Sequence, residues 1–376
     1  MQLVKTQRDA LLRPLQIVSG IVERRHTLPI LANILIRKDG NQVTLLSTDI
    51  EVQISTHASI GSGSDAAATT VAARKLLDIL RALPDAEVTL SVSNKRMSLQ
   101  CGKSRFALQT LAAEEFPTVA QAEQYGAQFS LPQKTLKHLL NMVHFSMAQQ
   151  DIRYYLNGLL LVVEGKHVIA VATDGHRLAF SQITTEQEFA RQEVIIPRKT
   201  IIELQRLLEE TDDPVKLAIA TNQVKFDFSN IELISKLVEG KFPDYTRVIP
   251  KAYKNNFTLD REALLRSLQR AAIMTSDKFK GVRCMIEPGS LKISSTNADQ
   301  EEAVEELEID YAGDAIDIGF NVTYLLDVLI GRVGPIGLDG LPRGELAAED
   351  LLEQVLDDLV EFLGVVARGD QVDGPV

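Results

Sequence analysis

A period of about 125 residues runs through this chain, and it limits the possible folds more than any other feature. A helix-like segment with a leucine pair occurs at Leu11-Leu12 and recurs at Leu139-Leu140 and Leu264-Leu265, in steps of 128 and 125 residues. A second helical segment, with Leu or Ile at positions i, i+3 and i+4, recurs in steps of 124 and 123 residues. Its copies start at Val71, Ile195 and Ile318. A strand-to-turn signal and a Phe-Pro pair keep the same spacing, so we predict three tandem domains of ordinary size.

Between the helical segments the sequence changes to short runs in which apolar and polar residues alternate. The first unit has three such runs, over 88–92, 97–100 and 106–109, and VKLAIA, QVKFDF and IELISKL take the same places in the second. Alternation with tight polar turns is typical of antiparallel strands. The expected fold class is therefore α+β, with two helices packed on antiparallel sheet in each domain. We place the domains at 1–126, 127–252 and 253–330.

Beyond Ile330 the repeat is lost. Where three strands should follow the second helix, Gly and Pro residues interrupt 331–344 as a loop, and 345–362 has the pattern of an amphipathic helix with an acidic outer face. Its apolar stripe consists of Leu351, Leu352, Val355, Leu356, Leu359 and Val360. We interpret 331–376 as a divergent acidic tail that leaves the third domain incomplete.

The net charge of −11 argues against a protein that holds nucleic acid by bulk attraction. Most of that charge lies in the tail, where ten acidic residues face three basic ones, so the first 330 residues carry only −4. Two cysteines exclude a disulfide scaffold, and no apolar run is long enough to span a bilayer. The start of the chain does not have the pattern of a secretory signal, so we expect a cytoplasmic location and no contact with membranes.

An enzymatic interpretation would use His176 as a base, because Asp174 stands two residues before it and could orient it. Against this, Asp174-Gly175 is typical of a turn, and no nucleophile signature occurs in the chain. The six histidines also lack the spacing of metal ligands. We therefore predict that the protein is not an enzyme and uses no metal or cofactor.

Five segments, in order along the first 330 residues, resemble the family of bacterial DNA polymerase III beta subunits, the sliding clamps. They are LPILANILI (28–36), DIRYYLNG (151–158), ATDGHRLA (172–179), GKFPDYTRVIP (240–250) and FKGVR (279–283). The resemblance implies a head-to-tail homodimer, a ring of six domains whose helices line a hole for duplex DNA. Such a ring tethers the replicative polymerase and needs only weak phosphate contacts. Candidate contacts at matching positions are Arg25, Arg74, Lys75, Gln150, Tyr154, Tyr155, Arg198, Lys199 and Arg206.

The resemblance also implies a peptide-docking pocket on the second domain, for the linear motifs of polymerases and of the clamp loader. Carried over by motif, its lining is Leu156, Thr173, Gly175, His176, Arg177, Leu178, Pro243, Arg247 and Val248. The leucines, the proline and the valine would supply apolar walls, while Arg177 and Arg247 would hold carbonyls or a carboxylate of the peptide. The altered tail leaves the carboxy-terminal part of this pocket without a counterpart.

Ring closure, by the same resemblance, pairs an edge of the first domain with the third domain. The residues implied are Lys75, Arg105, Phe106 and Leu108 on one side and Ile273 and Met274 on the other. Alternation puts Phe106 and Leu108 on one face of a strand, which is also compatible with simple core residues. Two alternatives to the clamp stay open: an interaction protein of clamp fold whose ring no longer closes, and a hydrolase that uses Asp174 and His176.

Overall fold

The computed structural model describes residues 1–23, 28–93, 95–249, 255, 257–276 and 279–331. The chain folds into two compact units. The first consists of 1–137, 161–168 and 184–239, and the second contains 138–160, 169–183 and the described residues from 240 onward. The units do not coincide with the sequence repeats, because two long strands, β10 (Gly158–Thr173) and β11 (Leu178–Pro197), run through both units. The domain limits drawn from the period stay a prediction.

A twelve-stranded sheet organises the first unit, in the order β1-β6-β7-β8-β5-β2-β3-β4-β14-β13-β12-β9. Its strands are β1 (Gln2–Gln7), β2 (Asn33–Asp39), β3 (Gln42–Thr48), β4 (Val52–Ala58), β5 (Ala67–Ala72), β6 (Glu87–Ser93), β7 (Arg96–Cys101), β8 (Ser104–Leu111), β9 (Gln128–Pro132), β12 (Pro214–Ile219), β13 (Gln223–Phe228) and β14 (Ile231–Lys236). Strand β4 pairs antiparallel with β14, from Thr56 opposite Ile231 to Val52 opposite Ser235. This pairing joins the first sequence repeat to the second through backbone hydrogen bonds.

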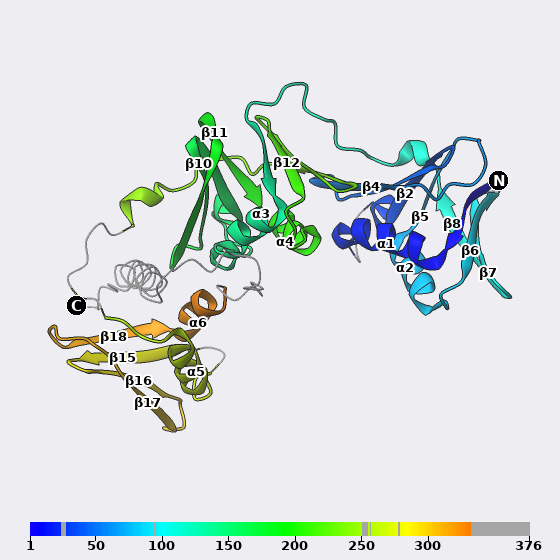
Figure 1. Ribbon diagram of the computed structural model, residues 1–376. Helices are drawn as coiled ribbons and strands as arrows, with labels where there is room; N and C mark the ends of the chain where they lie inside the picture. The colour runs from blue at the N-terminus through cyan, green and yellow to red at the C-terminus, as the bar shows by residue number, and fades with distance from the viewer. Residues whose placement is uncertain (24–27, 94, 250–254, 256, 277–278, 332–376) are drawn as a thin grey trace. The chain divides into compact units, whose positions relative to one another are not determined.

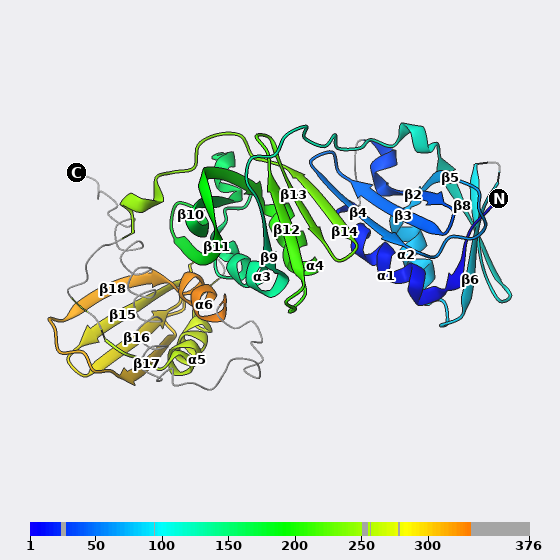
Figure 2. The same cartoon turned by 45° about the horizontal axis from the view of Figure 1, so that its top comes forward.

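Amphipathic helices cover this sheet. Helix α1 (Arg8–Val18) contacts β3, β4 and α2 (Ala73–Ala82), and Figure 2 shows both helices on the same side of β2, β3 and β4. Helix α4 (Arg198–Leu207) contacts η1 (Ser19–Ile21), a short 3₁₀ helix that follows α1. Each of the three helices buries its apolar stripe and exposes polar residues, as the helical period predicts.

The predicted starts of the second helices are wrong by two to four residues. Val71, Ile195 and Ile318 lie in strands β5, β11 and β18 (Ile316–Asn321), and the helices begin at Ala73, Arg198 and Val322. The preceding residues are held by strand pairing, as where Ile34 of β2 faces Val71. β-branched residues favour strands, so the apolar run at each helix start belongs partly to the sheet.

The second unit contains a four-stranded sheet in the order β17-β16-β15-β18. Its other strands are β15 (Gly281–Glu287), β16 (Ser290–Thr296) and β17 (Glu302–Glu308). Helix α5 (Arg261–Ala272) contacts β16, β17 and helix α6 (Val322–Gly331), and together they enclose a core centred on Leu268 and Ile293 (Figure 1). Asp260 caps α5 by accepting a hydrogen bond of 2.7 Å from the backbone N–H of Ala263.

The remaining elements of the second unit are short. Helix α3 (Gln133–Asn141) leads into it, followed by η4 (His144–Ser146), η5 (Tyr154–Leu156) and η6 (Tyr245–Arg247). Two further 3₁₀ helices, η2 (Pro29–Ala32) and η3 (Ala113–Glu115), belong to the first unit. Helices packed on antiparallel sheets in both units confirm the predicted α+β class. The predicted helix over 345–362 lies outside the described residues.

Candidate functional site

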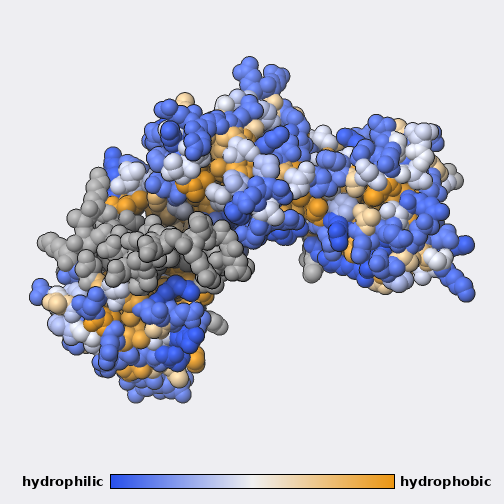
Figure 3. Space-filling model, viewed as in Figure 1, coloured by the Kyte–Doolittle hydropathy of each residue, from blue (hydrophilic) through white to orange (hydrophobic). Residues whose placement is uncertain are grey.

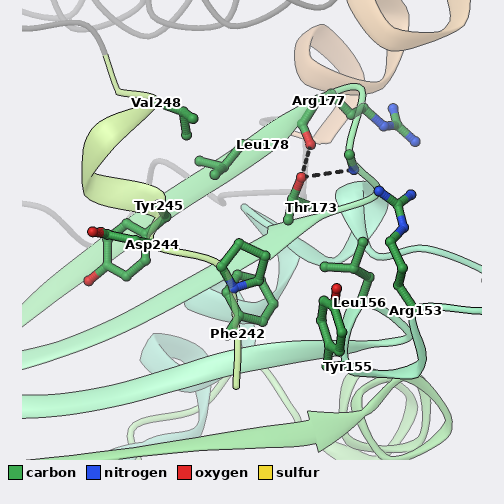
Figure 4. A pocket seen from close by; sticks show the side chains of 12 residues that line it. Arg153, Tyr155, Leu156, Thr173, Arg177, Leu178, Phe242, Asp244, Tyr245 and Val248 are labelled. Carbon is green, nitrogen blue, oxygen red and sulfur yellow. Dashed lines mark hydrogen bonds between the residues drawn. The ribbon is translucent and has the colours of Figure 1, made fainter. Parts of the chain in front are cut away.

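A pocket of about 360 Å³ opens in the second unit (Figure 4). Three segments build it: the chain around η5, the turn between β10 and β11, and the chain around η6. Its lining residues are Arg153, Tyr155, Leu156, Thr173, Gly175, Arg177, Leu178, Phe242, Pro243, Asp244, Tyr245 and Val248.

The turn between β10 and β11 forms one wall and is fixed by its own hydrogen bonds. The hydroxyl of Thr173 donates to the carbonyl of Arg177 at 2.6 Å and accepts from the N–H of Gly175 at 3.1 Å, as the dashed lines in Figure 4 mark. Oδ1 of Asp174 accepts from the N–H groups of His176 and Arg177, at 2.9 and 3.0 Å. The φ angle of Gly175 is +90°, a conformation that favours glycine, and a Cβ there would meet Nη1 of Arg153 at 2.7 Å. The predicted turn at Asp174-Gly175 is confirmed.

Apolar side chains form the floor and the rim of the pocket. Leu156 and Phe242 are buried, and the ring of Tyr245 packs 6.0 Å from that of Phe180. Figure 4 shows Leu178 and Val248 near each other at one end, where Val248 is 43% exposed. A hollow with apolar walls and a few polar groups suits an apolar side chain of a ligand.

Arg153 lines the pocket, although we did not predict it as a site residue. It donates to Asp151 through Nε at 3.0 Å and Nη2 at 2.8 Å, and to the carbonyl of Asp174 at 3.0 Å. The hydrogen bonds from Arg153 lower the pKa of the Asp151 carboxyl to about 2. The signal available was its place inside the motif DIRYYLNG, between Asp151 and Tyr154.

Seven of the nine predicted peptide-binding residues line this pocket: Leu156, Thr173, Gly175, Arg177, Leu178, Pro243 and Val248. His176 and Arg247 do not line it. The side chain of Arg247 is 84% exposed and pairs with Asp244 at 2.8 Å. Tyr155, predicted as a DNA contact, also lines the pocket, and Phe242, Asp244 and Tyr245 are further lining residues that we did not predict.

The guanidinium of Arg177, for which we predicted contacts with peptide groups, has partners within the protein. It donates to Asp174, to Asp327 and to the carbonyl of Phe145, so all three of its nitrogen atoms are engaged inside the protein. Asp174 is engaged as well, because its two oxygens accept from backbone N–H groups and from Arg177. His176 is exposed, and its backbone N–H, not its ring, donates to the Asp174 carboxylate that the hydrolase hypothesis requires to orient that ring.

Three predicted DNA contacts gather around the end of α1 and η1 in the first unit. Nη2 of Arg206 donates to the carbonyl of Ile17 at 2.7 Å, and Nη2 of Arg74 donates to that of Val22 at 3.1 Å. Cations near the carbonyl end of a helix are favoured by its dipole. Lys199 pairs with Glu23 at 2.7 Å, and although burial lowers its pKa, the hydrogen bonds to Asp49 and Glu23 raise it overall.

The other predicted DNA contacts are distributed over both units. Lys75 is exposed on α2 and Arg198 half-buried at the start of α4, both in the first unit. In the second unit, Gln150 and Tyr154 are exposed, and Gln150 has a φ angle of +57°. Arg25 lies outside the described residues.

The predicted dimer residues Arg105, Phe106 and Leu108 lie on strand β8, part of which forms a free edge of the first unit's sheet. In the first unit, 104–109 of β8 pair with β7 on one side, whereas β5 reaches β8 only at Thr110 and Leu111. Among the described residues, 104–109 thus have no strand on their second side. Phe106 and Leu108 share one face of β8 and are half-buried, and Arg105 beside them is exposed. The expected common face of Phe106 and Leu108 is confirmed, and full burial is not.

In the second unit, β17 is an edge strand with the sequence EAVEELE. Glu302, Glu306 and Glu308 are exposed, whereas Glu305 binds Arg270 of α5. Ile273 follows α5, which packs on β17, and is 72% exposed; Met274 beside it is half-buried. The face of the molecule in Figure 3 is largely hydrophilic, with separate apolar patches. A large apolar side chain as exposed as that of Ile273 is typical of an interaction surface.

Among the described residues, none of the helices is both long and apolar enough to cross a membrane. Nor do those residues contain a group of three or more His, Cys, Asp or Glu side chains placed to hold a metal ion.

Family models match the chain in three consecutive segments. The model described as the N-terminal domain of the DNA polymerase III beta subunit matches 1–120, the central domain matches 130–244, and the C-terminal domain matches 246–331. Curated relatives named beta sliding clamp have similar sequences. The protein from Pseudomonas putida is 44% identical over 326 residues, which is 86% of this chain and 88% of the relative. The protein from Vibrio cholerae is 41% identical over 365 residues, 96% and 98% of the two chains.

Solved structures are similar as well. The sliding clamp from Pseudomonas aeruginosa bound to griselimycin is 43% identical, with a TM-score of 0.84 over 88% of this chain and 90% of that one. The clamp from Caulobacter crescentus, described with polyethylene glycol bound to a putative beta-motif tethering region, is 38% identical, with a TM-score of 0.82 over 89% and 91%.

Proposed function

Because the chain belongs to the family of DNA polymerase III beta subunits, the beta sliding clamps, we propose that two copies close head to tail into a ring around duplex DNA. The ring tethers the replicative polymerase to its template and thereby makes synthesis processive. It needs no reaction of its own, so the protein acts without catalysis. A protein of this function works where the bacterial chromosome lies, in the cytoplasm.

The pair of free sheet edges carries this proposal. The edge of β8 includes Arg105, with Lys103 beside it, and the edge of β17 carries four glutamates without a basic residue. Opposite charges attract, and a free strand edge adds another strand through its backbone groups. Pairing β8 of one copy with β17 of the other therefore satisfies both edges. Ile273, Phe106 and Leu108 supply the apolar centre that a stable interface needs.

Head-to-tail pairing explains why the two edges differ. Copies joined through two unlike surfaces form a closed ring only if the successive rotations from copy to copy add up to a full turn. Two copies form the smallest such ring. Each copy then contributes one β8 edge and one β17 edge, so in the dimer all four of these edges have a partner strand. Two closed contacts also make the dimer tighter than either contact alone, through effective concentration.

The basic residues of α2 and α4 are the groups that we assign to the DNA. Arg74, Lys75, Arg198, Lys199 and Arg206 all belong to these two helices. Arg74, Lys199 and Arg206 are each held by an internal carbonyl or carboxylate, which restrains the cation and weakens any phosphate contact. Weak contacts to phosphates, without contacts to bases, are what a sliding ring requires.

The pocket of the second unit is the site that we assign to the linear motifs of polymerase and clamp loader. Its apolar floor at Leu156 and Phe242 and its rim at Leu178 and Val248 suit two apolar side chains of an extended peptide. Arg153, which also lines the pocket and is partly exposed, is a further cation that we assign to the polar groups of the peptide, beside Arg177 and Arg247. The Pseudomonas aeruginosa clamp binds griselimycin, so this compound is a suitable first probe.

The mass in solution tests the ring. At low micromolar concentration, light scattering behind a sizing column should give about 83 kDa, twice the chain mass of 41.5 kDa. A mass near 41.5 kDa would contradict the closed ring and favour an interaction protein of clamp fold.

A further inference from the structure

The side chain of Arg177 belongs to a polar cluster outside the pocket. Figure 4 shows the guanidinium extending away from Leu156 and Phe242, toward the pale orange ribbon of α6. We call this group the Arg177 cluster; it consists of Phe145, Asp174, Arg177, Tyr324 and Asp327.

Each nitrogen atom of the guanidinium has a partner from a different element. Nε donates to Oδ2 of Asp174 in the turn at 3.2 Å, and Nη2 donates to the carbonyl of Phe145 in η4 at 2.6 Å. Nη1 donates to Oδ2 of Asp327 in α6 at 2.5 Å. The ring centroids of Tyr324 and Phe145 lie 4.5 and 5.6 Å from Cζ, so both rings stack near the cation.

Burial makes these partners necessary. The side chain of Arg177 is only 10% exposed, and a buried cation without a partner is costly. The guanidinium is planar and its donors have fixed directions, so one position must satisfy all three acceptors. A displacement of α6 would remove both Asp327 and Tyr324 from Arg177 at once.

The backbone of the same residue forms the pocket. The carbonyl of Arg177 accepts the hydrogen bond of Thr173, and Leu178, the next residue, is part of the apolar rim. Arg177 therefore contributes its backbone to the pocket wall and its side chain to the docking of α6. A change in the pocket wall therefore affects the docking of α6, and the reverse, through this one residue, without further residues between them.

We propose that Arg177 is a positioning residue that couples occupation of the pocket to the docking of α6. The inference rests on the proposed function of the pocket as a ligand site. A ligand that requires the native turn stabilises docked α6, and by thermodynamic reciprocity docked α6 raises the affinity for the ligand by the same factor. Because α6 packs on α5, which packs on β17, pocket occupancy then also acts on the element that carries the proposed dimer edge.

The variant Asp327→Asn tests this coupling, because Asp327 does not line the pocket. It keeps the size of the side chain and removes the charge that holds Arg177. Asp317→Asn is the matched control: Asp317 forms an ion pair of the same 2.5 Å with Arg283, in the same unit and away from the pocket lining. With griselimycin as probe, calorimetry should show about tenfold weaker binding for Asp327→Asn and less than a twofold change for Asp317→Asn.

Hydrogen exchange of the unmodified chain gives a second readout, which does not depend on the folding of a variant. Griselimycin should slow exchange of the α6 amides over 322–330 in the unmodified chain, and this protection should be lost in Asp327→Asn. A merely structural role for Arg177 would lower stability without such ligand-dependent protection. Equal affinities of the two variants, or α6 exchange that is unchanged by the ligand, would overturn the coupling alone. No binding by the unmodified chain would contradict the proposed pocket function, and the inference with it.

Discussion

Arg177 and Asp327 are 150 residues apart in the chain, yet Nη1 of the first donates a 2.5 Å hydrogen bond to Oδ2 of the second. The turn that shapes the pocket is thereby tied to the last described helix. Arginine in a clamp pocket invites the interpretation of a ligand contact, and that was our prediction from sequence. The geometry adds an internal role for this side chain, and Arg153 is a second, more exposed cation of the pocket lining.

Ile273 should be required for the dimer. It is 72% exposed, so Ile273→Arg leaves the fold of one copy intact while it puts an unpaired charge into the proposed apolar centre of the interface. Sedimentation velocity should show the variant mainly as a monomer at concentrations where the unmodified chain is a dimer. Ile152→Arg, at a position 95% exposed in the same unit, is the control and should stay dimeric. A dimeric Ile273→Arg would refute this interface.

Val248 should contribute to ligand affinity. Its side chain lies at the rim and is 43% exposed, so Val248→Asp disturbs the fold little and brings a charge against the apolar part of the ligand. We expect griselimycin to bind at least tenfold more weakly, that is, by about 1.4 kcal/mol. Ile202→Asp, 45% exposed on α4 in the other unit, should bind normally. Equal binding by both variants would place the ligand elsewhere.

Asp151 should titrate unusually low. The hydrogen bonds from Arg153 lower its pKa from 3.8 to about 2, so the group favours folding above its unfolded pKa and this contribution is lost as the pH falls toward 2. Carbon NMR of the carboxyl groups can follow the transition. Arg153→Gln removes the main cause, and the pKa of Asp151 should then move back toward 3.8. A value near 3.8 in the unmodified chain would contradict the pair.

Cys284 should be unreactive in the folded chain. Burial raises the pKa of its thiol to about 12, so almost no thiolate is present at pH 8. Cys101 is buried as well. An aromatic disulfide reagent should therefore react with fewer than one thiol per chain on the time scale of minutes, and with two after unfolding in denaturant. Rapid reaction of the native protein would show that the core around Cys284 opens.

Arg198 should contribute to the salt dependence of DNA binding. Replacing it by Gln removes one cation per copy from the start of α4, and each lost phosphate contact lowers the slope of log K against log salt by about 0.9. Lys216→Gln is the control with the same loss of charge, on strand β12. The two variants should differ in slope; equal slopes would mean that Arg198 does not contact phosphate.

The repeat made much of this fold predictable. Leu11, Leu139 and Leu264 mark helices α1, α3 and α5, because a buried helical stripe and a period-two strand pattern are local signals. Local signals also explain the misplaced helix starts. An apolar residue such as Val71 or Ile195 fits the pattern of a helix and that of a strand, and only its strand partner assigns it to the strand. Phe106 and Leu108 share a face as alternation requires, but their partial exposure depends on a free sheet edge that one sequence does not display.

The pocket was less predictable, because three distant segments build it. Leu156, Leu178 and Pro243 were found through motifs, whereas Phe242 and Tyr245 lie inside the motif over 240–250 and were not selected, because their direction depends on the packing of η6. The role of Arg177 follows from Asp327, which lies in another repeat and has no local signal. Similarly, Lys199 of the second repeat forms ion pairs with Glu23 and Asp49 of the first, where strands β4 and β14 pair the two repeats. No periodicity in the sequence predicts these ion pairs.

Retention on circular DNA tests the central claim most directly. The protein, loaded by its cognate clamp loader onto a nicked plasmid, should stay bound through gel filtration in moderate salt and should leave when a restriction enzyme cuts the circle, because a ring slides off a free end. Equal retention on the circle and on the cut DNA would contradict topological binding and refute the account of this protein as a closed ring.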